Sequence, residues 1–227
     1  MATSGTTAFT LDVADIIEEA YERIGSESRT GYAIKTARRS LNLMMLEWQN
    51  RGLNLWTVKQ GTESLVSGTA AYTLTGEKLD IIEAYCRTGS GTSQVDYSME
   101  RISVSSYSQL ANKNTQGRPT QFYLERVPGS ITVNLWPVPD SGSYTFGYYY
   151  MERIDDTGNS GAYTIDVPDR YLPALVSGLA YNLALKDIEK APLAPGLKQI
   201  YEEHWQLASE AAREKASIFL RPEVGYI

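Results

Sequence analysis

The residues best suited to chemistry in this chain are its single cysteine, Cys86, and its single histidine, His204. A nucleophilic thiol or hydroxyl needs an adjacent base, and a structural zinc site needs about four ligands. Cys86 ends the apolar run 81–86, and His204 lies far along the chain in helical sequence. Neither a dinucleotide-binding glycine motif nor a phosphate-binding P-loop occurs. We therefore predict no catalytic role for Cys86 or His204, no metal site and no cofactor.

Adjacent carboxylates are the remaining candidates for catalysis, as in glycosidases that use two acidic residues. Three pairs occur: Glu18–Glu19, Asp155–Asp156 and Glu202–Glu203. Neighbouring residues on a helix point in different directions, which argues against cooperation in the first and third pairs. The second pair lies in a turn-rich stretch where aspartate is common. We predict structural roles for all three pairs.

A basic group, Lys35, Arg38 and Arg39, falls on a predicted helix. It could face an anion or a protein partner, although a solvated helix face is the more common explanation. The whole chain has a formal net charge of -6 and a pI near 5.0. Proteins that grip nucleic acid usually show a basic excess, so we do not predict a nucleic-acid site here.

Helical apolar periodicity occupies both ends of the chain. It predicts helices over 11–24 and 32–51, a third after a cap at Asp166, and a fourth over 196–216. Each apolar stripe is too narrow for a stable isolated helix. We expect residues 1–54 and 162–216 to form one antiparallel helical bundle. The side chains expected to be buried in it are Trp48, Leu41, Leu179 and Leu183.

Residues 55–161 have β-type sequence, with alternating apolar positions and turn dipeptides. Apolar residues alternate over 131–135, and aromatic residues alternate over 144–150, which predicts two strands with one buried face each. The fold class expected is α+β, with a β-sandwich or an open barrel inserted into the helical bundle.

Composition is that of a folded protein, with 42% hydrophobic and 21% charged residues. Tyrosine, at 16 residues against 4 phenylalanines, suits strand surfaces and protein interfaces. No apolar run approaches the length of a membrane span, and the first ten residues lack the features of a signal peptide. A single cysteine fits assembly in a reducing cytoplasm.

Four short motifs in this order resemble a known family: LNLMMLEW at 41–48, GRPT at 117–120, WPVPD at 136–140 and VPD at 167–169. With Gly52-Leu53 and Leu55-Trp56 after the first motif, they resemble the head-to-tail adaptors of short-tailed bacteriophages (podoviruses). That family includes tail tubular protein A and the tail accessory, or head completion, proteins. The similarity covers nearly the whole chain.

The resemblance implies a non-enzymatic structural protein of the virion neck, assembled in the host cytoplasm. Its partners would be further copies in a ring, usually a dodecamer, with the portal protein above and the tail nozzle protein below. DNA would pass through the lumen during ejection without sequence-specific binding, and no membrane partner is implied. A helical bundle that carries a β domain is also typical of the family.

The C-terminal segment 217–227 does not continue the helical pattern, because Arg221-Pro222 stops helix propagation. The segment is too apolar to be expected to remain exposed to solvent without a partner. We expect it to dock on the portal, although folding back on its own bundle remains open. The docking residues expected are Phe219, Leu220, Arg221, Val224, Tyr226 and Ile227.

Two other functions remain open from the residues alone. One is a tail-associated cell-wall glycosidase that uses a carboxylate pair. The other is a carbohydrate-binding or receptor-binding module that uses tyrosine and tryptophan side chains of the β domain.

Overall fold

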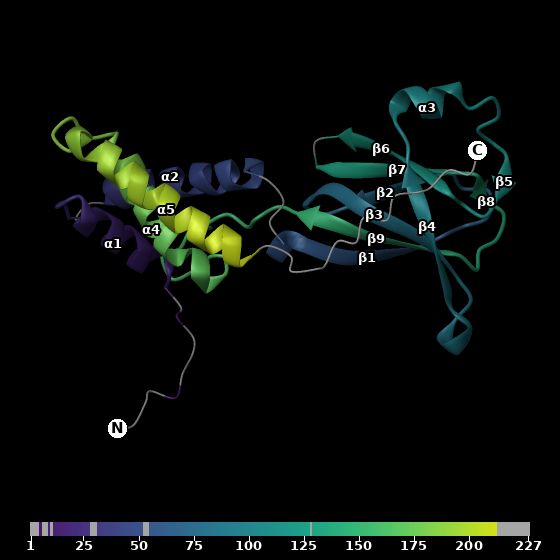
Figure 1. Ribbon diagram of the computed structural model, residues 1–227, viewed down its shortest axis with the longest axis horizontal. Helices are drawn as coiled ribbons and strands as arrows, with labels where there is room; N and C mark the ends of the chain where they lie inside the picture. Colours follow the sequence, from purple (N-terminus) through teal and green to yellow (C-terminus); the bar gives the residue numbers. More distant parts are fainter. Residues whose placement is uncertain are drawn as a thin grey trace, which may run out of the picture. The chain divides into compact units, whose positions relative to one another are not determined.

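The computed structural model describes residues 5, 9, 11–27, 31–51, 55–127 and 129–212. The chain divides into two compact units, one of Met1–Asn50 with Asp155–Ile227 and the other of Arg51–Ile154. The first contains four of the α-helices and the second contains the strands (Figure 1). The predicted α+β class is confirmed.

The helical unit contains α1 (Val13–Arg23), α2 (Gly31–Asn50), α4 (Leu172–Ala184) and α5 (Ala194–Ala211). Two short 3-10 helices, η3 (Asp169–Tyr171) and η4 (Ala191–Leu193), precede α4 and α5. Helix α1 begins at residue 13, two residues later than expected, because Asp12 is its N-cap. Asp12 Oδ1 accepts a hydrogen bond from the Asp15 amide at 2.8 Å, and Asp15 Oδ2 accepts one from the Asp12 amide at 3.3 Å.

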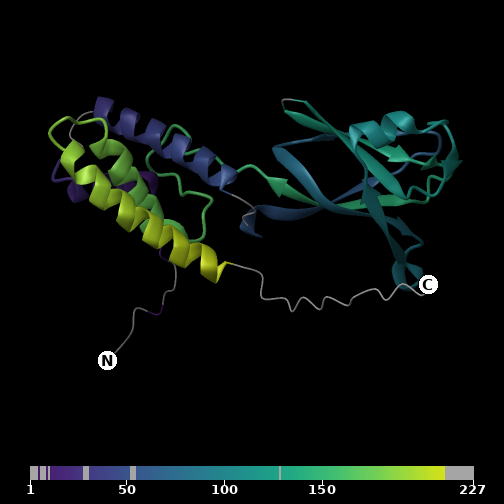
Figure 2. The ribbon, with the colours of Figure 1, turned by 45° about the horizontal axis from the view of Figure 1, so that its top comes forward.

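Helix α4 is apolar on all sides and lies among the other three helices, α1, α2 and α5 (Figures 1 and 2). Nine of its 13 residues are buried. Gly178 allows the neighbours to come close, since a Cβ there would lie 2.5 Å from Met44 Sδ and 2.8 Å from the Tyr201 ring. Helices α2 and α5 thus approach the same point of α4.

Trp48 ties α2 to α5 inside this unit. Its side chain is fully buried, and its indole Nε1 donates a 2.6 Å hydrogen bond to the Tyr201 hydroxyl. Its ring centroid lies 4.6 Å from that of Trp205 and 5.8 Å from that of Tyr171. The other three side chains predicted to be buried are also buried: Leu41, Leu179 and Leu183.

The β unit contains one curled sheet of seven strands, in the order β1-β9-β3-β4-β6-β7-β2 (Figure 1). The strands are β1 (Val58–Ser64), β2 (Ala71–Thr75), β3 (Lys78–Thr88), β4 (Val95–Arg101), β6 (Gln121–Val127), β7 (Ser130–Trp136) and β9 (Thr145–Glu152). This single sheet curls into a half-barrel. Of the two predicted alternatives, the open barrel therefore describes the unit better than the β-sandwich. A small second sheet pairs β5 (Gln116–Gly117) with β8 (Val138–Pro139). Three short helices complete the unit: η1 (Leu55–Thr57), η2 (Gly91–Ser93) and α3 (Val104–Gln109).

The concave core of this sheet follows the alternation predicted from the sequence. In β7, Ile131, Val133 and Leu135 are buried. In β9, Phe146 and Tyr148 are buried and stack with ring centroids 5.2 Å apart. Strands β4 and β6 are parallel neighbours, and the other pairs in this sheet are antiparallel.

Replacing Trp48 with alanine should destabilise the protein by about 3–5 kcal/mol, because it empties the largest buried site between α2 and α5. Denaturant unfolding followed by circular dichroism measures this loss. Leu43→Ala, on the same helix but 61% exposed, is the matched control and should cost less than about 0.5 kcal/mol. A similar loss in both variants would contradict the prediction.

Candidate functional site

Cys86 lies in the core of the β unit, opposite Phe146 in the β3–β9 ladder. Its side chain is fully buried. Burial raises the pKa of the thiol to about 11, and the nearby Asp140 also raises it while Arg118 opposes the shift. A thiol in this state is not a nucleophile at neutral pH.

His204 lies on α5 in the other unit, where its Nδ1 is 3.2 Å from Ser177 Oγ. The Ser177 hydroxyl donates to the Pro173 carbonyl at 2.6 Å. With that proton committed to a backbone carbonyl, the serine hydroxyl does not donate to the histidine. Activation of a serine nucleophile requires that donation.

The three carboxylate pairs make local contacts. Glu19 forms an ion pair with Arg23 at 3.0 Å on α1. Asp156 accepts a 2.8 Å hydrogen bond from the Gly158 amide, and Glu203 accepts one of 2.9 Å from Gln199. Within the described ranges, no group of three or more His, Cys, Asp or Glu residues is placed to hold a metal ion.

The predicted basic group on α2 is split by the fold. Arg38 Nη1 donates a 2.9 Å hydrogen bond to the Asn159 carbonyl, so it fastens α2 to the segment that follows the β unit. Lys35 and Arg39 are exposed, and neither forms an ion pair with another described residue. Two of the three cations therefore remain available to a partner.

Lys186 adds a third cation to this face, which sequence reasoning missed. Its Nζ donates to the Thr36 carbonyl at 3.3 Å and contacts the Ser40 hydroxyl on α2. Burial lowers the pKa of Lys186, and the positive charge of Arg39 lowers it further. Lys186 follows α4 in the sequence, so only the packing of α4 against α2 reveals its position.

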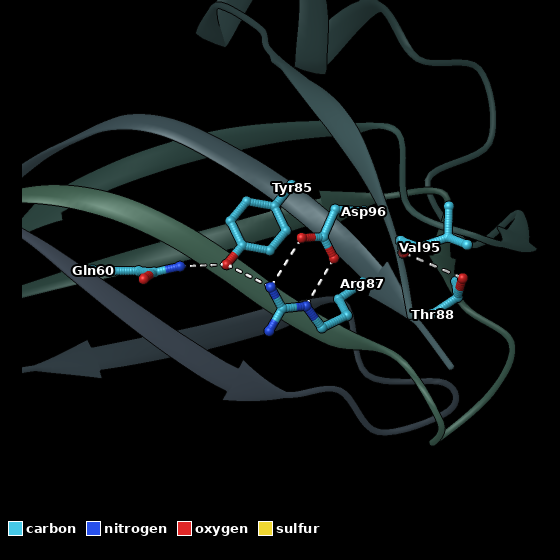
Figure 3. A network of polar contacts seen from close by, with 6 residues as sticks. All are labelled: Gln60, Tyr85, Arg87, Thr88, Val95 and Asp96. Atoms are coloured by element: carbon cyan, nitrogen blue, oxygen red, sulfur yellow. Dashed lines mark hydrogen bonds and ion pairs between the residues drawn. The ribbon is translucent and has the colours of Figure 1, made fainter. Parts of the chain in front are cut away.

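Figure 3 shows a network of polar contacts on the β unit. Residues of this network line a hollow of about 530 Å³. Arg87 at the end of β3 binds Asp96 of β4 through two hydrogen bonds, Nε–Oδ1 at 2.7 Å and Nη2–Oδ2 at 2.9 Å. The Tyr85 hydroxyl accepts from Arg87 Nη2 at 3.3 Å and from Gln60 Nε2 at 2.6 Å. In the sequence, the opposite charges of Arg87 and Asp96 on either side of residues 88–94 are the signal for this pair.

The network has a structural explanation. Gly147 lies opposite Tyr85 in the β3–β9 ladder, and a Cβ at Gly147 would be 2.2 Å from the tyrosine ring. The ring therefore lies across the glycine and directs its hydroxyl toward Arg87. The hydrogen bond from Arg87 lowers the pKa of Asp96, so the carboxylate stays ionised and is a poor general acid.

The expected portal-docking residues, 219–221, 224, 226 and 227, lie outside the described residues. That expectation remains a proposal. No described helix is both long enough and apolar enough to cross a lipid bilayer.

Residues 11–220 match the family model of the SU10 adaptor protein. The chain belongs to the SU10 adaptor family. The match runs through both units and confirms the resemblance to phage head-to-tail adaptors that the sequence motifs indicated. SU10 adaptors are structural proteins of the phage particle, and this is the general role of the chain. A search of curated proteins found no match.

The Cys86 thiol of this SU10 adaptor should resist alkylation by iodoacetamide at pH 8 in the folded protein. Its pKa of about 11 leaves little thiolate, and its burial blocks the reagent. Mass spectrometry after a timed reaction measures the modified fraction. Rapid labelling without denaturant, at the rate seen in urea, would contradict the buried position.

The Asp96 carboxylate should titrate below its ordinary pKa of 3.8 in the wild-type protein. In Arg87→Met the midpoint should rise toward 3.8, because the hydrogen bonds that favour the ionised form are lost. Because the pKa of Asp96 is lower in the folded protein than in the unfolded chain, its carboxylate stabilises the fold above about pH 4. This stabilisation is lost as the pH falls through the pKa of the folded state. Carboxyl-carbon NMR measures both midpoints. Arg101→Met, which removes an ion pair to Asp80 instead, is the control and should leave Asp96 unchanged.

Proposed function

We propose that this SU10 adaptor forms a closed ring, a dodecamer in the full assembly, that joins the portal to the tail nozzle. The ring surrounds part of the DNA channel. The observation that carries the proposal is the family match over residues 11–220, because it includes nearly all of both units.

Charge supports the channel role. Each subunit has a formal net charge of -6, so a ring of subunits accumulates a strongly negative potential. Such a wall repels phosphate and keeps DNA from binding during ejection. The proposal therefore needs no basic lumen and no base-specific contacts.

The proposal includes the absence of catalysis. The buried Cys86, the His204–Ser177 hydrogen bond and the locally bonded carboxylates favour structural roles over a reaction centre. Cell-wall hydrolysis and glycan binding are the outcomes that would replace the adaptor function. Neither has a specific observation in its favour.

We propose, further, that helices from both chain segments act as one bundle that carries residues 55–161 as an inserted β domain. The contacts of α4 with α1, α2 and α5, and the Trp48–Tyr201 hydrogen bond, support this view. In this arrangement the C-terminal residues 217–227 leave the bundle and reach the portal.

The decisive experiment combines electron microscopy of the purified protein with co-assembly on portal particles of the same phage. Closed rings, and particles that gain this subunit, are expected. A protein that stays monomeric with the portal present, or that degrades peptidoglycan or retains a glycan, would overturn the adaptor proposal.

Deletion of residues 223–227 should abolish binding to portal particles and leave the thermal stability of the isolated protein nearly unchanged. The reason is that an apolar segment used for docking contributes to the complex rather than to the fold. Differential scanning fluorimetry and co-sedimentation measure the two effects. The control is a conservative replacement in the same segment, Ile227→Val, which should bind normally.

A further inference from the structure

The helical unit contains an elongated groove between α1 and the start of α4. Two adjoining hollows of about 630 Å³ and 570 Å³ share Leu11, Leu172 and Pro173 in their linings. One end is lined by α1 residues, including Glu18 and Glu22. The other end has mostly apolar surface, although Asp169 and Arg170 also line it. The groove therefore changes from acidic to apolar along its length.

Two carboxylates in this groove are uncompensated. Glu19 is neutralised by Arg23, and Asp15 accepts a hydrogen bond from the Asp12 amide. Glu18 and Glu22 are exposed and have no ion-pair partner among the described residues. They lie four residues apart (22 − 18 = 4), one helical turn, so both carboxylates follow one edge of the groove.

The outer face of α2 has the complementary pattern. This face lies opposite the buried stripe of α2, and α2 lies at the edge of the helical unit (Figure 2). Its first half presents the exposed cations Lys35 and Arg39, also four residues apart (39 − 35 = 4). Its second half presents Leu43, which is 61% exposed, and Leu46, which is 48% exposed. This face therefore changes from basic to apolar.

We propose that the α1–α4 groove of one subunit binds the outer face of α2 from the next copy of the chain. This inference rests on the proposed ring. The two helices run antiparallel, with Lys35 against Glu22 and Arg39 against Glu18. The same register places Leu46, seven residues beyond Arg39 (46 − 39 = 7), against Leu11, seven residues before Glu18 (18 − 11 = 7). On α2, at about 1.5 Å per residue, Leu46 lies two turns beyond Arg39. Leu11 directly precedes Asp12, the N-cap of α1, so both leucines lie at the same end of the proposed contact.

Two features favour a second copy as the occupant of the groove. The charges of the two surfaces are opposite, and each surface is made by different helices of the same chain, so every copy offers both. Such a heterologous contact propagates from subunit to subunit and closes into a ring when the rotation permits.

Charge reversal tests the contact in the full-length protein. The variants Lys35→Glu/Arg39→Glu and Glu18→Lys/Glu22→Lys should each weaken self-association on the order of tenfold or more, because two attractive pairs become repulsive. Sedimentation velocity across a concentration series measures the association. The matched control is Lys198→Glu/Glu210→Lys, which reverses exposed charges of α5 outside both surfaces and should associate like the wild type.

Rescue separates a specific contact from a folding defect. A chain with all four reversals has both surfaces exchanged and should assemble again. An equimolar mixture of the two double variants should also assemble, in alternation, because each supplies the charge that the other lacks. Failure of both rescues, with thermal melting unchanged from the wild type, would overturn the proposal.

The outcomes also separate this contact from the ring itself. Wild-type protein that forms no ring overturns the ring and this interface together. Rings that persist in both double variants overturn only the interface. If Glu18→Lys/Glu22→Lys lowers the melting temperature of the monomer without changing association, the two carboxylates act within their own subunit and the inter-subunit contact is wrong.

Discussion

Burial of α4 is the constraint on which the helical unit depends. A helix that is apolar on every side must be covered on every side, and the cover comes from α1 and α2 before the β unit in sequence and from α5 after it. Gly178 allows α2 and α5 to pack closely against α4, because any side chain at this position would displace Met44 or Tyr201. The Trp48–Tyr201 hydrogen bond then satisfies two polar atoms that this close packing removes from water.

Covering α4 determines which surfaces remain for other proteins. Helices α1 and α2 each bury one face in the core and expose the opposite face to solvent. On α1 the outward stripe is acidic, and on α2 it is basic and then apolar. Arg38, which sequence places beside Lys35 and Arg39, is instead turned toward the Asn159 carbonyl and fastens the returning chain.

The β unit uses a different device, in which glycines make room for tyrosines on neighbouring strands. Tyr85 lies across Gly147, and Tyr148 lies across Gly61, where a Cβ would be 2.5 Å from its ring. The first of these pairs directs the tyrosine hydroxyl to Arg87 and closes the network seen in Figure 3. The abundance of tyrosine therefore reflects sheet packing as well as surface contact.

The sequence by itself determined the α+β class, the family, the four helices of the helical unit and the buried face of β9, because apolar periodicity and motif order are local properties. From residue counts it also predicted no catalytic role for Cys86 and His204. Only the tertiary structure decided that the sheet is one half-barrel. It also decided that Lys186 lies near Arg39 on the α2 face, and that Arg38 instead bonds the Asn159 carbonyl. Those outcomes depend on contacts between residues far apart in sequence, whose geometry is set by how α4 and the curled sheet are packed and not by any local pattern.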